Sequence, residues 1–348
     1  MDAEFNALVH NHMWRLVPFQ PGMNVVGCKW VFRTKRKADG SIERHKARLV
    51  ANGFNLVAGE DFFENLSPVV KPTMVRLLLS LAVSRGWTIR QLDIHNAFLN
   101  GELAETVYMR QPPGYEDKSL TDHVCLLKKS LYGLKQAPHA WFTRLHDFLI
   151  SVSFSPSKTD VSLFIYSRDN IRLYFLVYVD DILIMGSNSD RVTALIDKLA
   201  LEFKVRDMGV PSFFLVIEIV PLSGGMLLSQ KRYMKDILKR AGMVDCKPVV
   251  SPVSSAKITD EVVVPYADPT QYRSLACALQ YLTVTLNLSL RISRSTFMDI
   301  HAYSDSNWAG DPNDRKSTSG FAVFLGSNLI SWVCRKQRTV ARSSTEAE

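Results

Sequence analysis

Two adjacent carboxylates, Asp180 and Asp181, lie between the apolar runs VYV and ILI. Two extended runs that meet in this way predict a β-hairpin, although a tight turn normally prefers Gly or Asn, and neighbouring like charges repel. A polar turn is the simplest interpretation. The apolar residues on both sides favour a second interpretation, in which the two strands hold the carboxylates half-buried and without a compensating charge, so that they can bind a divalent cation.

A third acid, Asp93, ends the extended run TIRQLDI just before a turn. Taken alone, a strand-end Asp is explained by hydrogen bonds to nearby backbone. Together with Asp180 it would form a two-metal site, in which one ion activates an attacking 3′-hydroxyl and the other stabilises a pyrophosphate leaving group. Mg²⁺ suits this role because it takes one or two carboxylates together with substrate phosphates, and Mn²⁺ is the alternative ion.

The segment 29–48, KWVFRTKRKADGSIERHKAR, is strongly basic. It holds eight Lys and Arg against Asp39 and Glu43, a net charge of +6 in a chain whose total is +8. Asp39-Gly40 is a hairpin signal between two extended runs. A solvated surface is one interpretation of this charge. The other is a twisted hairpin whose alternating cations reach phosphates, and nucleic acid is the commonest partner of so basic a chain.

Composition excludes several other classes of protein. The 348 residues are 47% hydrophobic and 22% charged, which indicates two or three globular domains rather than a disordered or fibrous chain. The five scattered cysteines show no CxxC pair, which argues against a disulfide framework and a structural zinc site. The apolar runs are too short to cross a bilayer and the acidic start does not resemble a signal peptide, so we expect no membrane partner.

Periodicity indicates the elements that would position these residues. A strand followed by a turn is predicted over 88–101, a hairpin over 172–187 and an extended run over 212–221. Helices are predicted over 73–86, 130–153, 190–203 and 229–241. The segment 242–270 is rich in loop signals, and short strands resume within 301–348.

The segments around these residues resemble the reverse transcriptase region of copia-type LTR retrotransposon polyproteins. LVYVDDILI is similar to the palm signature of that family, and its companion motifs occur in the family's order: KWVFRTKRKADGSIERHKARLVANGF, QLDIHNAFLNGEL, VYMRQPPGY and LKKSLYGLKQAPHAWF. YRSLACALQYLT and the tail beginning YSDSNWAGD match as well, so the resemblance covers nearly the whole chain. It implies an α+β fold, a right-hand polymerase with fingers and an antiparallel palm sheet, followed by a truncated ribonuclease H-like fragment.

The resemblance implies RNA-directed DNA polymerisation, with an RNA template, a DNA primer and dNTPs as partners. Asp93, Asp180 and Asp181 match the palm triad, with Asp93 and Asp180 closest to the metal and the Ile94 carbonyl assisting. Phe98 matches the aromatic residue that excludes a 2′-hydroxyl, although a core aromatic explains it equally. The other implied nucleotide-site residues are Lys35, Lys46 and Arg48 in the fingers hairpin, and Tyr132, Gly133 and Gln136, where a helix start is the simpler account of Gly133.

The implied domain order is a lead-in at 1–28, fingers and palm at 29–241, a shortened thumb or connection at 242–300, and the ribonuclease H-like fragment at 301–348. In that fragment Asp305 and Glu348 match the first two acids, with Glu346 as the alternative second acid; a turn residue and a helix-start acid are the simpler accounts. The third and fourth acids are missing and the fragment is too short for its own core, so we expect no ribonuclease H activity. The family's virus-like particle makes the cytoplasm the expected location, with the nucleus as the alternative.

Four departures from the family pattern bear on activity. Val216, Cys277 and Asn307 replace Gly, Gly and Asp, and a connecting segment is missing after Thr285. Val216 stands in the region that seats the primer end, where positive φ or close backbone approach would make a Val costly. Two main hypotheses follow, an active polymerase and a non-catalytic remnant that binds template–primer through its basic hairpin. A DNA-templated polymerase is disfavoured by the flanking motifs.

Overall fold

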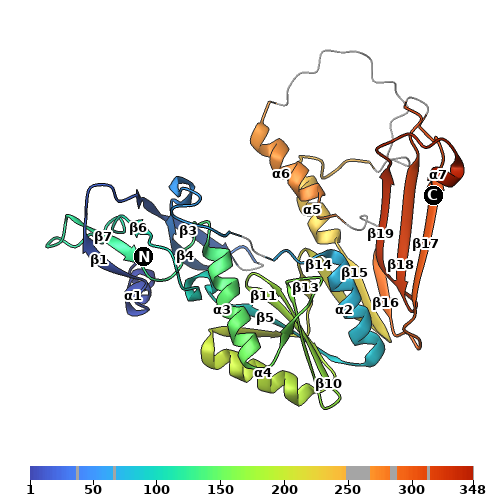
Figure 1. Cartoon of the computed structure of the whole chain (residues 1–348), viewed down its shortest axis with the longest axis horizontal. Coiled ribbons are helices and arrows are strands. Elements are labelled where there is room, and N and C mark those ends of the chain that lie inside the picture. The colour runs from blue at the N-terminus through green and yellow to red at the C-terminus, as the bar shows by residue number, and fades with distance from the viewer. Residues whose placement is uncertain (37–38, 66–67, 248–266, 283–287, 312–313, 348) are drawn as a thin grey trace. The chain divides into compact units, whose positions relative to one another are not determined.

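A computed structural model of the chain describes residues 1–36, 39–65, 68–247, 267–282, 288–311 and 314–347 (Figure 1). These residues form two compact units, each assembled from two stretches of chain. The first unit contains Met1–Val70 and Thr88–Gly209, and the second contains Lys71–Trp87 and Val210–Glu348. The division at Gly209 falls inside the region 29–241 that we expected to form one domain.

A wholly antiparallel sheet at the centre of the first unit carries the acids, as predicted. Across the sheet its strands are β12 (Val205–Gly209), β5 (Thr88–Ile94), β11 (Asp181–Gly186), β10 (Ile171–Tyr178), β9 (Leu163–Arg168) and β8 (Ser155–Pro156). Alternate side chains such as Leu92, Ile182 and Ile184 are fully buried against two helices, α3 (Ala137–Ser151) and α4 (Ser189–Glu202). The predicted hairpin over 172–187 and the predicted strand before Asp93 are confirmed.

Local hydrogen bonds explain where the two helices on this sheet begin. Asn188 caps α4 by accepting a hydrogen bond from Arg191 N at 2.9 Å, and the buried stripe of α4 recurs at helical spacing from Val192 to Leu199. Helix α3 begins only at Ala137, although the sequence predicted helix from residue 130. The preceding segment is instead tied to the base of the basic hairpin, since Ala51 N donates to the Tyr132 carbonyl at 2.8 Å.

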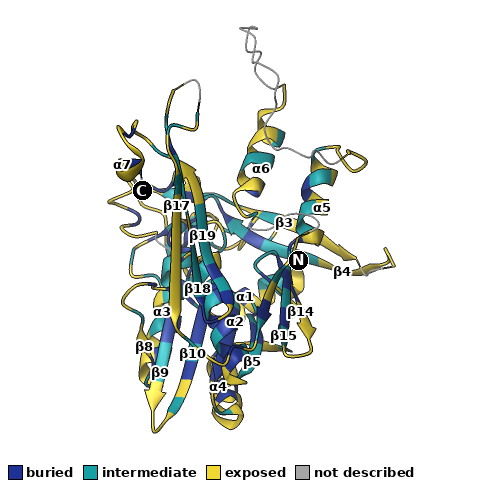
Figure 2. Cartoon of the chain, turned by 90° about the vertical axis from the view of Figure 1, so that its right-hand side faces the viewer, coloured by how far each residue is buried: buried dark blue, intermediate teal, exposed yellow. Residues whose placement is uncertain are grey.

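The remainder of the first unit is a smaller sheet and the basic hairpin. The small sheet consists of β1 (Trp14–Pro18), β7 (His123–Leu127), β6 (Tyr108–Met109) and β2 (Val25–Val26), with α1 (Asp2–His10) and the short helix η1 (Gly53–Asn55) in the same unit. The hairpin consists of β3 (Cys28–Arg36) and β4 (Ile42–Ala51). Its base is buried at Leu49 and Ala51, whereas its outer half is exposed (Figure 2). The two strands flank Asp39-Gly40, in agreement with the predicted hairpin.

The second unit contains two further sheets. One consists of β13 (Phe213–Phe214), β14 (Ile217–Leu222), β15 (Gly225–Ser229) and β16 (Leu290–Ser293), and the other of β17 (Ile300–Asn307), β18 (Thr318–Leu325) and β19 (Asn328–Lys336). Its helices are α2 (Pro72–Arg85), α5 (Lys231–Arg240), α6 (Pro269–Leu279) and α7 (Ser344–Ala347).

Helix α2 packs against β16 and β19. The buried Arg76 donates through Nε to the Ile330 carbonyl at 2.8 Å, and its guanidinium lies 4.1 Å from the centre of the Trp332 ring. Burial lowers the pKa of Arg76 to about 10. Ser84 Oγ accepts a hydrogen bond from Ser295 N at 3.1 Å. The tail sheet is thus covered by a helix from far upstream, as its short length requires.

The extended run predicted over 212–221 is in fact a hairpin between β13 and β14. Its two turn residues are Leu215 and Val216, with φ of 47° and 63°. Positive φ at both central positions is typical of a type I′ turn, which normally selects Asn and Gly. A β-branched Val at such a position is strained, so the structure supports the argument that a Gly-like conformation is required at residue 216.

No helix among the described residues is long and apolar enough to cross a membrane. All five cysteines are free thiols, and only Cys125 is fully buried.

Candidate active site

The strands that carry the acids are neighbours in the central sheet. Asp181, the first residue of β11, is the cross-strand partner of Asp93 near the end of β5. Asp180 precedes β11, and its carbonyl oxygen accepts a hydrogen bond from Ile94 N at 2.9 Å. The three acids predicted from the sequence therefore lie together at one end of the sheet.

The turn that presents Asp180 is also held by α3. Tyr178 pairs with Asp181, so the two turn residues are Val179 and Asp180. The predicted Asp180-Asp181 turn is therefore wrong by one position, because Asp181 already belongs to the ladder. Trp141 Nε1 donates to the Val179 carbonyl at 2.7 Å. Val179 has φ of 57°, a conformation that a β-branched residue keeps only when its surroundings impose it.

Burial and mutual repulsion raise the pKa values of two of these acids. The pKa of Asp181 is raised to about 6, chiefly by burial and then by the charges of Asp180 and Asp93. Burial also raises the pKa of Asp180, and Asp93 adds to this, whereas a backbone hydrogen bond and the charges of Arg48 and Lys46 oppose it. Neighbouring carboxylates with raised pKa values are stabilised in their charged form by a cation placed between them.

The register of the β3–β4 hairpin puts its cations on one face. It pairs Arg33 with Lys46, Lys35 with Arg44, and Val31 with Arg48. Cross-strand partners share a face of the sheet, and side chains two residues apart along a strand do the same. Arg33, Lys35, Arg44, Lys46 and Arg48 therefore project from one side of the hairpin, together with Lys29, which pairs with Val50.

This basic face lines a single pocket of about 660 Å³ together with Asp93 and Asp180, and the pocket is here called the carboxylate pocket. Its lining residues are Val31, Arg33, Lys35, Arg44, Lys46, Arg48, Asp93, Ile94, His95, Asn96, Asp180, Lys204, Val205 and Arg206. All three basic residues predicted for the nucleotide site are in this set, together with Asp93, Asp180 and Ile94. Asp181 does not line the pocket.

Positive charge is crowded in the carboxylate pocket. Burial lowers the pKa of Lys46, and the charge of Arg48 lowers it further. The pKa of His95 is lowered by burial and by the charges of Lys46 and Lys204, which favours its neutral imidazole. With two lining carboxylates against seven Lys and Arg, the pocket suits an anion that brings several negative charges.

Tyr132 connects the basic hairpin with the segment that follows Asp93. The Arg48 guanidinium lies 4.4 Å from the centre of the Tyr132 ring, and Arg48 Nε is buried with no hydrogen-bond partner. The Tyr132 hydroxyl donates to Asn96 Oδ1 at 3.5 Å, the outer limit for such a bond, and its ring meets Phe98 edge-on at 5.4 Å. Burial raises the pKa of Tyr132.

The remaining predicted nucleotide-site residues lie outside the carboxylate pocket. Phe98, in the short helix η2 (Ala97–Asn100), packs against the hydrophobic cores on both sides of it. Gly133 has φ of 92°, and a Cβ there would lie 2.1 Å from the Ala51 carbonyl oxygen, so close backbone approach explains this Gly. Gln136 is buried and lines a different pocket.

Sequence reasoning missed four polar residues that line the carboxylate pocket, namely His95, Asn96, Lys204 and Arg206. Lys204 and Arg206 alternate around Val205 at the start of β12, and Arg206 is the cross-strand partner of Asp93. The alternation is a usable strand signal, but pairing of β12 with β5 could not be read from it.

Of the acids predicted in the tail, Asp305 and Glu346 lie in described residues, and the helix α7 that carries Glu346 packs against the strand β17 that carries Asp305. Asp305 lies on the exposed strand β17 opposite Gly320. Glu346 Oε2 accepts a hydrogen bond from Arg342 N at 2.7 Å, and Glu348 lies outside the described residues. No three His, Cys, Asp or Glu side chains among the described residues converge closely enough to hold a metal ion unaided.

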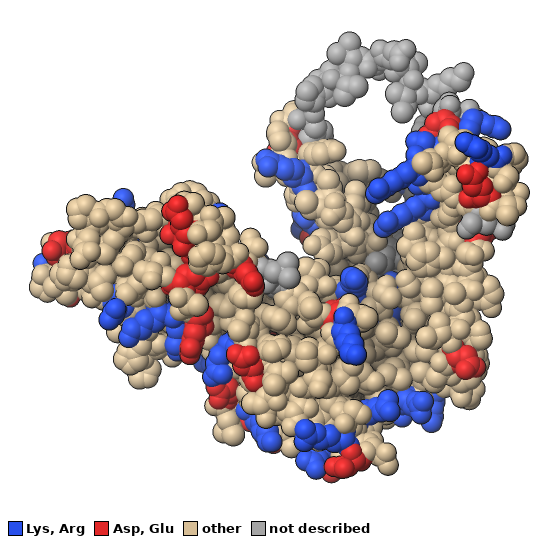
Figure 3. Space-filling view, in the orientation of Figure 1, with Lys and Arg blue, Asp and Glu red and all other residues tan. Residues whose placement is uncertain are grey.

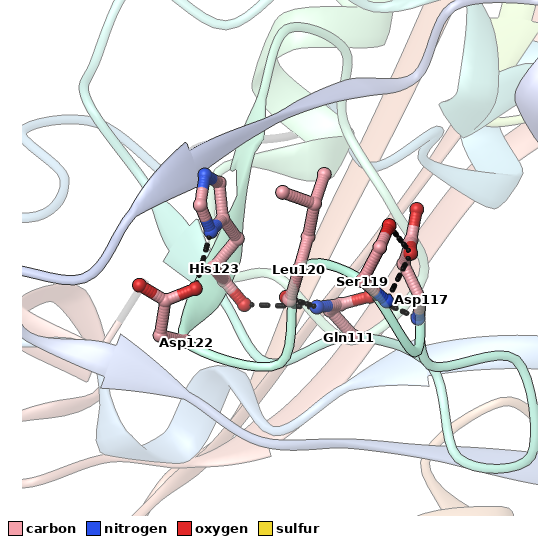
Figure 4. Close-up of polar contacts among 6 residues, drawn as sticks. All are labelled: Gln111, Asp117, Ser119, Leu120, Asp122 and His123. Atoms are coloured by element: carbon pink, nitrogen blue, oxygen red, sulfur yellow. Dashed lines mark hydrogen bonds and ion pairs between the residues drawn. The ribbon is translucent and has the colours of Figure 1, made fainter.

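A second polar cluster closes the loop between β6 and β7 (Figure 4). The Gln111 amide donates to the carbonyls of Leu120 at 2.7 Å and His123 at 3.0 Å, and it accepts from Asp117 N at 2.8 Å. His123 Nδ1 contacts Asp122 at 2.7 Å. Because each polar atom of the Gln111 side chain is hydrogen-bonded within the loop, we interpret this cluster as one that stabilises the loop conformation.

The chain is similar in sequence to known proteins. Residues 11–255 match the family model described as reverse transcriptase (RNA-dependent DNA polymerase). The retrovirus-related Pol polyprotein from transposon RE1 of Arabidopsis thaliana is 43% identical over 386 residues, which cover 100% of this chain and 26% of that protein. The corresponding polyprotein from transposon TNT 1-94 of Nicotiana tabacum is 34% identical, over 100% of this chain and 30% of that protein.

A shorter relative is matched over most of its length. The putative transposon Ty5-1 protein YCL074W of Saccharomyces cerevisiae is 26% identical, over 74% of this chain and 96% of that protein. The alignment with the RE1 polyprotein spans 386 positions, whereas this chain has 348 residues, so the relative contains residues with no counterpart here. If this chain has lost a connecting segment, the alignment must contain a gap of this kind. The junction predicted for it, after Thr285, lies outside the described residues.

Proposed function

Because this chain belongs to the reverse transcriptase family, in the branch of copia-type retrotransposon Pol polyproteins, we propose that it adds deoxynucleotides to a DNA primer on an RNA template. The observation that carries the proposal is the carboxylate pocket, in which Asp93 and Asp180 share one cavity with five cations of the β3–β4 hairpin. Phosphoryl transfer depends on positioning and on neutralising the charge of the transferred group, and this combination of side chains supplies both.

In this proposal the β3–β4 hairpin is the fingers, and the central sheet with α3 and α4 is the palm. The sheet β17–β19 is the ribonuclease H-like fragment, and the thumb or connection remnant lies within 242–300. The chain spans less than a third of the RE1 and TNT 1-94 polyproteins, so any activity of the complete polyproteins is a separate matter.

The donors at the carboxylate pocket fit Mg²⁺, with Mn²⁺ as the alternative, because carboxylates and a backbone carbonyl are hard oxygen ligands. Asp93, Asp180 and the Ile94 carbonyl would hold the ions. Two carboxylates are enough, since Mg²⁺ usually completes its shell with water and substrate phosphates. When bound, the ions make the primer 3′-hydroxyl a better nucleophile and neutralise the leaving pyrophosphate.

The chain's own side chains would bind and orient the nucleotide. Lys35, Lys46 and Arg48 would contact the triphosphate and stabilise the charge that develops on it. Phe98, whose position is fixed by the two cores and by Tyr132, would lie beneath the sugar and exclude a 2′-hydroxyl. Neutral His95 would donate or accept a hydrogen bond without adding to the crowded positive charge.

The strained turn at Leu215 and Val216 favours a second candidate, a remnant that binds template–primer but does not extend it. A family Gly would hold the same turn without strain, so the Val has altered a segment that the family uses at the primer end. Such a remnant would keep the basic hairpin and therefore its salt-sensitive affinity for nucleic acid.

Primer extension on an RNA template with Mg²⁺ and dNTPs tests the proposal. Asp180→Asn should abolish extension, whereas Asp197→Asn, on the exposed side of α4, should leave it unchanged. The remnant hypothesis predicts no extension by either variant or by the parent chain, with template–primer still bound and released by salt. Extension by Asp180→Asn at the parent's rate would refute the assignment of the site.

A further inference from the structure

Strand β17 is an outer strand of the tail sheet, and in the described part of the chain it pairs only with β18. Half of the backbone N–H and C=O groups of such a strand point away from its neighbour. Residues 300–307 make no other backbone hydrogen bond to any described residue. All of them except Ser306 are exposed, and Figure 2 shows the exposed strand along its length. The outer edge of β17 can therefore accept another strand.

Helix α7 packs on a face of the tail sheet and leaves this edge open. The Ala347 carbonyl in α7 accepts hydrogen bonds from Gln337 Nε2 at 2.6 Å and from Ser319 Oγ at 3.4 Å. Ser319 belongs to β18 and Gln337 directly follows β19, so α7 lies over the sheet and not beyond its outer strand. In agreement with this position, Ile300 is 71% exposed and Tyr303 is 65% exposed.

The other outer strands have features that discourage pairing with a second chain. Strands β2, β8 and β13 are two residues long, β1 ends at Pro18, β12 has a bulge between Asp207 and Gly209, and β3, β4, β16 and β19 contain Lys or Arg. Strand β17 has eight residues, none of which is Lys, Arg, Pro or Gly, and its register with β18 is unbroken. Figure 3 shows few charged side chains along the right-hand border of the view, where Figure 1 places β17. A long, regular edge without these features is a template for another strand.

The sequence of β17, IHAYSDSN, is complementary to itself in the antiparallel direction. When two copies pair about Tyr303, the two tyrosines lie opposite each other, and His301 of each copy lies opposite Asp305 of the other. An imidazole N–H donates to a carboxylate, and directly opposite aromatic side chains stabilise a strand pair. Pairing about Ser304 would overlap the strands equally, but it would place His301 opposite Asn307. The side chains therefore select the register centred on Tyr303.

We propose that β17 pairs with β17 of a second copy of this chain, so that two tail sheets join into one continuous antiparallel sheet. Main-chain hydrogen bonds supply the affinity of such an added strand, and the side-chain pairs fix its register. The contact uses the same edge on both copies, so it closes a dimer and does not propagate into a filament. The dimer is separate from the proposed polymerase function, and it can be tested with neither nucleic acid nor dNTP present.

Sedimentation of the full chain over a range of concentrations tests the proposal. The expected result is a concentration-dependent rise in mass from 39.3 kDa to twice that value. Tyr303→Lys places two lysines opposite each other and should weaken the dimer at least about tenfold, because directly opposite like charges repel. Tyr281→Lys is the matched control, since Tyr281 is 52% exposed and lies outside the tail sheet, and it should change nothing. The melting temperature of each variant shows whether the fold is kept.

A charge exchange tests the register. His301→Asp alone places two carboxylates opposite each other at both ends of the strand pair and should weaken the dimer about tenfold. Adding Asp305→His to the same chain restores the opposite pairs with their order reversed, so the double variant should dimerise like the parent. A double variant as weak as His301→Asp would overturn this register.

Disulfide trapping tests the same geometry in a chain whose exposed Cys246, Cys277 and Cys334 are replaced by Ser. Tyr303→Cys should cross-link two copies under mild oxidation, because directly opposite Cα atoms are about 4.5–5.5 Å apart, within the range of a disulfide. Ile300→Cys should not, because the two thiols would be separated by about 20 Å along the strands. Three results would overturn the proposal: a monomer at every concentration, a dimer unaffected by Tyr303→Lys, or equal cross-linking by the two Cys variants.

Discussion

Replacing Tyr132 by leucine should weaken nucleotide binding although it leaves the charges of the carboxylate pocket intact. The ring of Tyr132 holds the Arg48 guanidinium at 4.4 Å, and Arg48 Nε is buried without another partner. A cation–π contact is worth about 0.5–1 kcal/mol when exposed and about 2 kcal/mol when desolvated. The burial of Arg48 Nε places this contact toward the upper value.

A loss of about 1–2 kcal/mol corresponds to roughly a 5- to 30-fold weaker affinity for dNTP. Tyr132→Phe keeps the ring and loses only the 3.5 Å hydroxyl contact with Asn96, so its affinity should fall less than about twofold. In primer extension the leucine variant should raise KM and change kcat little. If the parent chain does not extend primers, the anisotropy of a fluorescent dNTP gives the same comparison.

The control is a double-mutant cycle with Arg48→Gln. If Tyr132 acts by holding Arg48, then Tyr132→Leu should have almost no further effect once Arg48 is neutral. Equal losses for Tyr132→Leu and Tyr132→Phe would assign the effect to the hydroxyl. Additive losses for Tyr132→Leu and Arg48→Gln would refute the reasoning, because the two residues would then act independently.

Three further predictions concern stability. The pKa of Asp181 is raised to about 6 in the folded chain, so the unfolded chain loses this proton at lower pH and the free energy of unfolding falls as pH rises from about 4 to 6. Asp181→Asn should remove that fall and add about 1 kcal/mol to the free energy of unfolding above pH 6, after allowance for solvent screening. Urea unfolding of both chains at pH 5 and pH 7.5 measures this difference. Val216→Gly should raise the melting temperature by relieving about 1 kcal/mol of net strain, and an unchanged or lower value would contradict the assigned turn. Gly133→Ala should destabilise the chain by about 3 kcal/mol, because its Cβ would meet the Ala51 carbonyl; wild-type stability in calorimetry would show that the close approach is wrong.

Local patterns predicted most of the elements, and long-range pairing was the part they left open. The hairpin turns at Asp39-Gly40 and near Asp180, and the helices at 72–85 and 189–202, follow from alternation, turn residues and caps that lie within a few positions of each other. The turn before Asp181 was placed one residue late because only the pairing of Tyr178 with Asp181 defines it.

The sequence likewise predicted the motif residues of the candidate site but not the residues that strand pairing adds to it. Asp93 and Asp180 were expected to meet because a motif carried them, whereas Lys204 and Arg206 enter the carboxylate pocket only because β12 pairs with β5. Gln136 belongs to a motif that the family resemblance assigns to the nucleotide site, but it lies with the face of α3 that lines a pocket other than the carboxylate pocket. Motif membership did not predict which cavity a side chain would face.

The packing of α2 has a consequence for the order in which the chain can fold during synthesis. Arg76 bonds to Ile330, 254 residues downstream, and Ser84 bonds to Ser295, 211 residues downstream. The ribosome therefore synthesises α2 long before β16 and β19, which cover it. Until those strands are made, the apolar side chains of α2 stay exposed and can bind chaperones or other nascent chains. A fragment cut at residue 255, where the family match ends, would contain α2 without β16 or β19 and should aggregate more readily than the full chain.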